Sequence, residues 1–243
     1  MRLNIIFKEY AVGTLIDKSI AEYLDLQNKD IVCVAGAGGK TSTIRLLKDE
    51  LIKRQQSVLI TTTTKMFKTV ESIVVRDLSL IKRKLNQKQW VITGKDMTAK
   101  IGSWDNEYIQ SLIQLADITL IEADGAKRLP FKMPNNTEPV YLEQANKIVY
   151  LVGMSAIGQE LKQLCRSELL MEFLHKRAQD RLTKDDIIKV LLSKQGAQKA
   201  TEGKSVYIIL NQVDNLYLLK QAVAIARAVH NTDLKVAISC YKN

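Results

Sequence analysis

The chain has 243 residues, and its 36 lysines and arginines exceed its 26 acidic residues, giving a formal net charge of +10. Its hydrophobic content of 46% is enough for a buried core, whereas no apolar run reaches the ~18 residues that span a bilayer. Residues 1–8 are too short and too early charged for a signal peptide, so we expect a cytoplasmic protein without a membrane partner. The lysines are scattered and no nucleic-acid-binding motif is present, which argues against nucleic acid as a partner.

Cysteine and histidine usage excludes a zinc site. The chain has three cysteines, far apart and without a CxxC pair, and two histidines. No zinc-ligand spacing can be assembled from these residues. Cys33 lies in an apolar run, where a small core residue is expected.

Short apolar runs alternate with amphipathic segments along most of the chain. Several runs are almost entirely apolar, which is typical of strands in a parallel sheet that is covered on both faces. We predict strands over residues 31–35, 58–62, 90–93, 118–122, 148–152, 206–210 and 236–239. The alternation favours a doubly wound, mostly parallel α/β sheet in a three-layer sandwich like that of the P-loop NTPases.

Helices are predicted between these strands, over residues 43–54, 183–193 and 216–230. Thr183 is a candidate N-cap for the second helix, with two aspartates in the first turn. Residues 155–179 also have a helical pattern. We therefore expect one α/β domain over residues 1–243, with a small helical insertion around residues 155–195.

A glycine-rich segment joins the first predicted strand to the first predicted helix. Residues 34–42 read Val-Ala-Gly-Ala-Gly-Gly-Lys-Thr-Ser, and this strand–turn–helix context is that of a phosphate-binding loop. Glycines allow positive φ and let backbone amides approach phosphate oxygens, while the helix N-terminus adds partial positive charge. The expected nucleotide-binding residues of this loop are Gly36, Ala37, Gly38, Gly39, Lys40, Thr41 and Ser42.

The loop also predicts how a metal-bound triphosphate is held. Lys40 is expected to reach the β- and γ-phosphates, and the Thr41 hydroxyl to bind Mg²⁺, with Ser42 as the alternative ligand. Val34 stands where the common pattern has a glycine, so this is a shorter variant that resembles the loops of Mur ligases and some metal-insertion NTPases. A simple turn between strand and helix is the alternative interpretation.

Two carboxylates follow the predicted strand at residues 118–122. Glu122 and Asp124 are two residues apart, so both can face the nucleotide. One is expected to hold Mg²⁺, directly or through water, and the other to orient an attacking water or hydroxyl. Solvated acids at a strand end are the alternative.

Basic residues follow these carboxylates. Lys127, Arg128 and Lys132 are expected to be mobile cations that stabilise charge on a transferring phosphate, or else an exposed charge run. We assign the candidate catalytic roles to Lys40, Asp124 and Lys127.

A run of threonines leaves the second predicted strand. Thr61 and Thr62 suit a strand structurally. Thr63, Thr64 and Lys65 are expected near the phosphate loop, where a hydroxyl can bind phosphate or a metal-bound water, and Thr64 is a candidate metal ligand.

Asn211 and Asp214 form an Asn-x-x-Asp pattern after an apolar strand. In many GTPases this pattern reads guanine, and a later strand ends at Ser239, where GTPases keep a base-contacting turn. A helix N-cap at Asn211 or Asp214 is the alternative. The sequence leaves open whether the nucleotide is ATP or GTP.

Four segments together resemble the YqeC family, accessory proteins of selenium-dependent molybdenum hydroxylases. They are residues 34–42, 60–66, 122–130 (Glu-Ala-Asp-Gly-Ala-Lys-Arg-Leu-Pro) and 138–140 (Glu-Pro-Val). The resemblance implies a P-loop NTPase fold and a role in maturing or loading a molybdenum-dependent enzyme, with that hydroxylase or its maturation factors as partners. The chain departs from the family at Cys165, before Arg166, and at Thr137, two positions where the family tends to have histidine.

Three functions remain open at this point. The first is a Mg²⁺-dependent NTPase that acts as an accessory factor in hydroxylase maturation. The second is a small ATP-dependent ligase or kinase, favoured by the Mur-like loop. The third is a non-catalytic GTP-binding interaction module. All three require ATP or GTP together with Mg²⁺.

Overall fold

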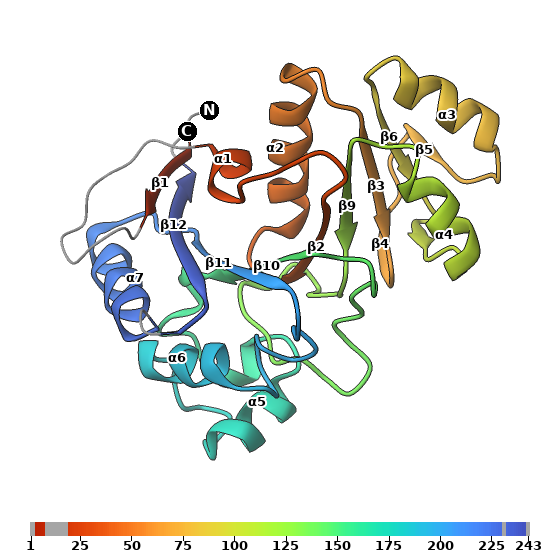
Figure 1. The fold of residues 1–243 in the computed structure, drawn as a ribbon. Coiled ribbons are helices and arrows are strands. Elements are labelled where there is room, and N and C mark those ends of the chain that lie inside the picture. Colours follow the sequence, from red (N-terminus) through yellow and green to blue (C-terminus); the bar gives the residue numbers. More distant parts are fainter. Residues whose placement is uncertain (1–2, 8–18, 230–231, 242–243) are drawn as a thin grey trace.

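The computed structural model describes residues 3–7, 19–229 and 232–241, with side chains described over 19–229 and 232–239. Within this part, one nine-stranded sheet has the order β1-β12-β11-β10-β2-β9-β3-β6-β5 (Figure 1). Every neighbouring pair is parallel except β1 and β12. Its strands are β1 (Leu3–Phe7), β2 (Ile31–Gly36), β3 (Val58–Thr62), β5 (Ser72–Ile73), β6 (Trp90–Thr93), β9 (Ile118–Glu122), β10 (Lys147–Gly153), β11 (Ser205–Asn211) and β12 (Lys235–Tyr241).

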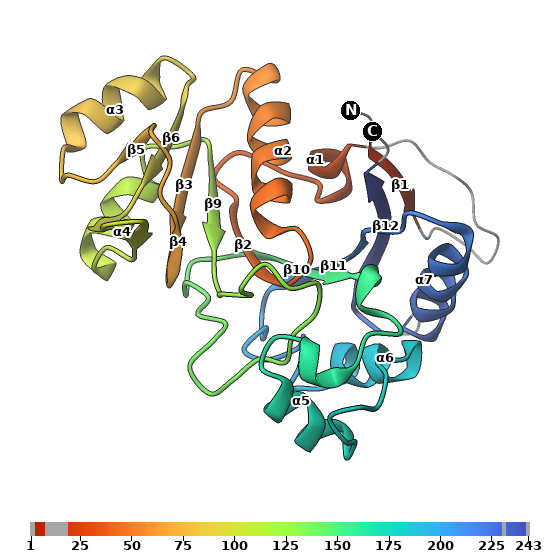
Figure 2. The same ribbon diagram turned by 180° about the vertical axis from the view of Figure 1, so that it is seen from behind.

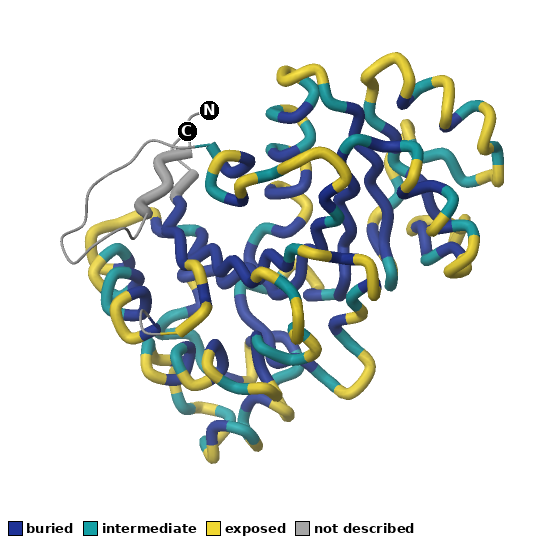
Figure 3. Tube along the Cα trace, in the orientation of Figure 1, coloured by how far each residue is buried: buried dark blue, intermediate teal, exposed yellow. Residues whose placement is uncertain are grey.

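All seven predicted strands are present in this sheet, which confirms the mostly parallel α/β fold. The predicted bounds agree within one residue except at the end of β12. The edge strand β1 and the two-residue β5 were not predicted. The central strands are buried on both faces, which is why their sequences are nearly all apolar (Figure 3).

Helices cover both faces of the sheet and complete three layers (Figures 1 and 2). One face packs against α1 (Ile20–Tyr23) and α2 (Lys40–Lys53). Ile44, Leu47 and Leu51 of α2 belong to the core cluster on this face. The other face carries a second cluster. Its helices are α3 (Leu78–Asn86), α4 (Asn106–Ile113), α5 (Ser167–Leu174), α6 (Lys184–Leu192) and α7 (Leu216–Ala228).

The three predicted helices correspond to α2, α6 and α7. Thr183 caps α6 as predicted, because its side chain accepts a hydrogen bond from the Asp186 amide. In contrast, α2 begins at Lys40, three residues earlier than expected, so the end of the glycine-rich loop forms its first turn. Residues 155–179 are only partly helical, with the 3₁₀ turns Met154–Ala156 and Leu161–Gln163 before α5.

A small second sheet follows the end of β3. It contains β4 (Lys65–Phe67), β8 (Lys100–Gly102) and β7 (Lys95–Met97) in antiparallel order. Met66 and Ile101 anchor it in the α2-side core, and the residues on either side of them are largely exposed. The sequence does not predict this sheet because each strand is short and charged.

No helix in the described ranges is long and apolar enough to cross a membrane.

Candidate functional site

The glycine-rich loop at the end of β2 has a backbone that only glycine accommodates. Gly36 and Gly38 have φ of +86° and +83°. A Cβ on Gly36 would lie 2.2 Å from the Leu151 carbonyl oxygen, and one on Gly38 would lie 2.3 Å from the Gly153 Cα. The loop is therefore packed tightly against β10, and both glycines are required by conformation and by space.

The first turn of α2 opens onto a large cavity. Gly39 precedes the helix without a capping side chain, and the first amides of an α-helix have no intrahelical acceptor. Gly38 to Ser42 line a cavity of about 910 Å³. These unpaired amides and the positive end of the helix are what an anionic phosphate group requires.

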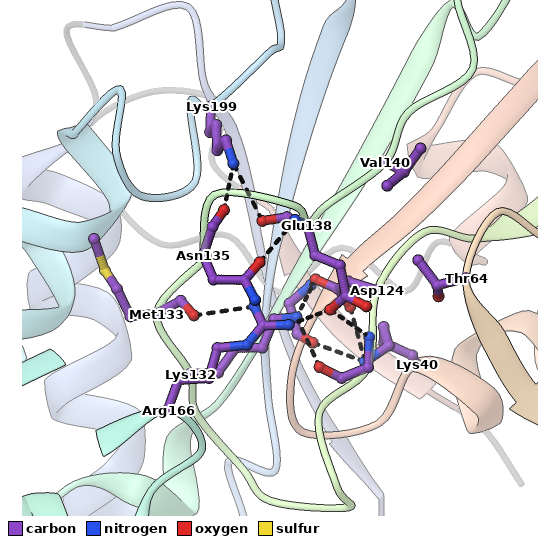
Figure 4. Close-up of polar contacts among 12 residues, drawn as sticks. Lys40, Thr64, Asp124, Lys132, Met133, Asn135, Glu138, Val140, Arg166 and Lys199 are labelled. Atoms are coloured by element: carbon purple, nitrogen blue, oxygen red, sulfur yellow. Dashed lines mark hydrogen bonds and ion pairs between the residues drawn. The ribbon is translucent and has the colours of Figure 1, made fainter. Parts of the chain in front are cut away.

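Lys40 is held beneath the loop by a buried carboxylate (Figure 4). Its Nζ lies 3.0 Å from Asp124 Oδ1 and donates to the Gly36 carbonyl at 2.8 Å. The other oxygen, Asp124 Oδ2, accepts from the Gly36 amide at 2.9 Å and lies 2.5 Å from Lys132 Nζ. The Asp124 carboxylate thus connects the glycine-rich loop to two lysines through contacts within the protein.

Lys132 is not the mobile cation that the sequence suggested. Its side chain is fully buried, and its Nζ also donates to the Gly125 carbonyl at 2.9 Å. Burial lowers the pKa of Lys132 to about 8, although the Asp124 charge partly opposes that shift. The alternative of an exposed charge run is equally wrong for this residue.

Glu122 has a different environment from Asp124. Its side chain lines the cavity although it is only 8% exposed, and Oε2 has no hydrogen-bond partner among the described residues. Desolvation raises the pKa of Glu122 to about 7, with the Asp124 charge adding to the shift and Lys40 opposing it. Asp124 Oδ1 also has no hydrogen-bond partner among the described residues, but it is ion-paired with Lys40, and Asp124 is not part of the cavity lining. Of the two predicted carboxylates, Glu122 is therefore the one that offers an unpaired oxygen to the cavity.

The loop that follows Asp124 is fixed by contacts from distant elements (Figure 4). The Glu138 carboxylate forms an ion pair with Arg166 and accepts from the Gly125 amide at 3.2 Å. Arg166 also donates to the Met133 carbonyl at 3.3 Å, and Lys199 donates to the Glu138 carbonyl at 3.4 Å. Arg166, just before α5, and Lys199, after α6, thus hold the loop over the sheet end.

Asn211 supports the glycine-rich loop. Its Nδ2 donates to the Gly38 carbonyl at 2.7 Å, and its Oδ1 accepts from Ser239 Oγ at 2.8 Å. Asp214 is exposed. The alternative interpretation, an N-cap at Asn211 or Asp214, is wrong, because Asn215 caps α7 through a hydrogen bond from the Leu218 amide.

The threonine run divides into two parts. Thr61 and Thr62 are fully buried and donate to backbone carbonyls at 2.9 and 2.7 Å, as strand residues. The Thr63 hydroxyl also donates to a backbone carbonyl, at 2.6 Å. Thr64 lies outside the lining of the cavity, whereas Lys65 is part of it.

The structure brings most of the predicted site together at one cavity. Residues 38–42, Glu122, Lys127 and Arg128 line it, with Asp124 directly beneath. Sequence reasoning missed Phe67, Lys100 and Gln212, which also line the cavity. It also missed the ion pair of Glu138 and Arg166. The only indication of this pair in the sequence is that both residues lie in or beside segments that resemble the family.

The similarity to known proteins extends over the part of the chain that forms most of this site. The family model described as YqeC protein matches residues 32–168, more than half of the sequence. A relative described as "Uncharacterized protein YqeC", from Escherichia coli (strain K12), is 30% identical over 139 residues, which is 54% of this chain and 54% of the relative. The match therefore spans about half the length of that relative, and no solved structure matches significantly. The family match includes the glycine-rich loop, both carboxylates and the Glu138–Arg166 pair, and this chain belongs to the YqeC family.

Proposed function

We propose that this protein binds a nucleoside triphosphate with Mg²⁺ and hydrolyses or transfers its terminal phosphate. The observation that carries the proposal is the first turn of α2, whose free amides open onto the cavity beside Lys40 and Glu122. A cavity of about 910 Å³ lies in the range of small-ligand sites.

The protein groups fit a metal-bound triphosphate. The exposed Thr41 hydroxyl and the unpartnered Glu122 oxygen are hard oxygen donors, which Mg²⁺ prefers. Mg²⁺ at such sites keeps several waters and is bound by one or two protein groups together with substrate phosphates. When bound, the ion supplies charge neutralisation at the terminal phosphate.

Each side chain then has a separate task. Lys40 leaves Asp124 and binds the β- and γ-phosphates, while Thr41 and Glu122 hold the metal or its waters. Where Thr41 and water alone would hold the metal, Glu122 would instead accept a proton from an attacking water or hydroxyl. Asp124 is a positioning residue for the loop in this scheme, and Lys127 contributes positive charge at the mouth.

Membership of the YqeC family supports the proposal of an accessory role for a molybdenum enzyme. The resemblance described above implies an accessory role, so we propose that nucleotide turnover assists the maturation of a selenium- and molybdenum-dependent hydroxylase. This proposal predicts slow turnover that a partner protein stimulates.

Transfer to a small molecule is the second candidate. The cavity favours it because its lining continues well beyond the phosphate loop, onto β4 and β8. A ligase or kinase needs such space for an acceptor, whereas simple hydrolysis does not.

Calorimetric titration with ATP and with GTP, each with Mg²⁺, tests the proposal. The wild type is expected to bind at least one nucleotide. Lys40→Ala and Thr41→Ala should each weaken binding at least tenfold, whereas Lys53→Ala, an exposed lysine at the other end of α2, should not. Thr41 is exposed, so its variant avoids the folding cost that removal of a buried lysine carries.

The same titration determines whether the protein prefers adenine or guanine nucleotides. Loss of GTP binding alone in Asp214→Asn would identify Asp214 as a guanine reader. If neither nucleotide binds to the wild type, the proposed function is wrong.

A further inference from the structure

The cavity reaches to both sides of the phosphate loop. Gln212, which follows β11, lines one end, and Lys65 and Phe67 of β4 with Lys100 of β8 line the other. In the sheet, β11 lies on one side of β2, whereas β3, which leads into β4, lies on the opposite side (Figure 1). A nucleoside extending towards β11 therefore leaves the end beside the small sheet unfilled.

That second end is strongly positive. Lys65 and Lys100 line it together with Arg128, which contacts Phe67, and none of the three forms an ion pair with any carboxylate of the described residues. The one carboxylate in the lining is Glu122, beside the phosphate loop. Three uncompensated cations facing the same open cavity repel one another, so an anion that binds among them lowers their free energy.

An exposed aromatic ring holds two of these cations in place. The Arg128 guanidinium carbon lies 4.5 Å from the Phe67 ring centroid, and the Lys100 ammonium lies 5.4 Å from the same centroid. Phe67 and Lys100 are direct partners across the β4–β8 ladder, so their side chains stand on the same face of the small sheet. These cation–π contacts restrict two long side chains that would otherwise move freely in water.

The nucleotide alone does not account for this charge. A magnesium triphosphate carries a net charge of about −2, and Lys40 with the α2 N-terminus, worth roughly half a charge, offsets most of it. Lys127 at the mouth offsets the rest, so Lys65, Lys100 and Arg128 exceed what a nucleotide in the loop requires. Guanidinium and ammonium groups together suit a phosphate group, since arginine donates two parallel hydrogen bonds and lysine adds a point charge.

We propose that Lys65, Lys100 and Arg128, with Phe67 as their platform, bind the phosphate group of a second small molecule while a nucleotide occupies the loop. The inference rests on the proposed function and adds the class of its second ligand. It also assigns the small sheet a role, that of the wall that carries this subsite.

The test uses the full chain saturated with Mg²⁺ and a non-hydrolysable ATP analogue, or the GTP analogue if GTP is the nucleotide bound. Inorganic phosphate and methyl phosphate are titrated calorimetrically into this complex at constant ionic strength. The first probe represents free phosphate, and the second represents a phosphorylated small molecule. Both are expected to bind saturably without displacing the analogue, and methyl phosphate at least as tightly.

Variants locate the site. Arg128→Ala and Lys100→Ala should each weaken methyl phosphate binding roughly tenfold, the effect of one charge-assisted hydrogen bond. Phe67→Leu should weaken it severalfold because it keeps an apolar side chain but removes the ring. The matched control is Lys95→Ala, an exposed lysine of β7 on the same small sheet that is outside the cavity lining, and it should leave binding unchanged.

Binding of the analogue is measured first, which separates the two proposals. If the wild type does not bind it, the proposed function and this inference both fail. If the analogue binds but neither phosphate probe does, or the probes displace it, only the subsite is refuted. Equal weakening of methyl phosphate binding by Lys95→Ala and Arg128→Ala would show a diffuse basic surface and overturn the inference. Polyglutamate serves as a third titrant, and its binding in the absence of binding by either phosphate probe would overturn the inference in the same way.

Discussion

Glu122 is expected to make the unliganded protein less stable as the pH rises. Its pKa is raised to about 7 from an ordinary value of 4.5, chiefly by desolvation. The charges near it are Asp124, which adds to the shift, and Lys40 and Lys132, which oppose it together with a hydrogen bond from Thr41. A carboxyl group that binds its proton more tightly in the folded state destabilises that state once the proton leaves, so stability falls between pH 4.5 and about 7.

The size of the effect follows from the two pKa values. Linkage from 4.5 in the unfolded chain to about 7 in the folded protein gives a total cost of about 3 kcal/mol at high pH. Between about pH 5.5 and about pH 8.5, roughly 2 kcal/mol of that cost develops. For a chain of this length, this corresponds to a fall in Tm of roughly 4–8 °C.

Urea unfolding of the wild type and Glu122→Gln at these two pH values isolates the effect. Glutamine has nearly the same shape but does not titrate, so the stability of the variant relative to the wild type should increase by roughly 2 kcal/mol from the lower to the higher pH. Glu202→Gln, at an exposed turn position, controls for the loss of one carboxylate elsewhere. A wild-type-to-variant difference that stays constant with pH would refute the reasoning, because Glu122 would then titrate alike in both states.

Three further predictions concern the loop and its supports. Lys132→Met should cost about 1–3 kcal/mol of unfolding free energy, because Asp124 loses one buried partner but keeps Lys40. The double variant with Asp124→Asn should be more stable than this single variant in urea unfolding. Gly38→Ala should lower the Tm and abolish calorimetric nucleotide binding, since its Cβ would overlap backbone at positive φ, and normal binding would contradict the rigid-loop interpretation. Asn211→Ala should weaken ATP and GTP binding alike, because it frees the Gly38 carbonyl; a loss confined to GTP would instead identify Asn211 as a base reader.

The sequence predicts the parts of the fold that are determined locally. The strands of the parallel sheet were found because burial on both faces leaves almost only apolar residues, as in 118–121. The glycine-rich loop was found because its glycines, lysine and hydroxyl residues are adjacent in sequence. The small sheet was missed because three-residue strands such as β4, with charged or exposed side chains around one buried Met66, have no periodicity to detect.

The errors at the site have a tertiary cause. In the sequence, Lys132 belongs to a charged run that predicts an exposed side chain, yet in the fold it is buried against Asp124. Whether a lysine is exposed or buried depends on the course of the intervening loop, and that course is fixed by Arg166 and Lys199 from far along the chain. No pattern within residues 124–132 contains that information.

The two lysines on Asp124 have unequal freedom, and the difference matters for the proposed function. A buried carboxylate that loses its only cation costs several kcal/mol, so Lys40 could not leave Asp124 for a phosphate if it were alone there. Lys132 is fully buried, is held by the Gly125 carbonyl and lies outside the cavity lining, whereas Lys40 is part of that lining. Lys132 would therefore remain with Asp124 if Lys40 turned towards a phosphate. The Gly36 amide also remains bound to Asp124. The second lysine would thus lower the cost of releasing the first, as the proposed nucleotide binding requires, and the loop would keep its support.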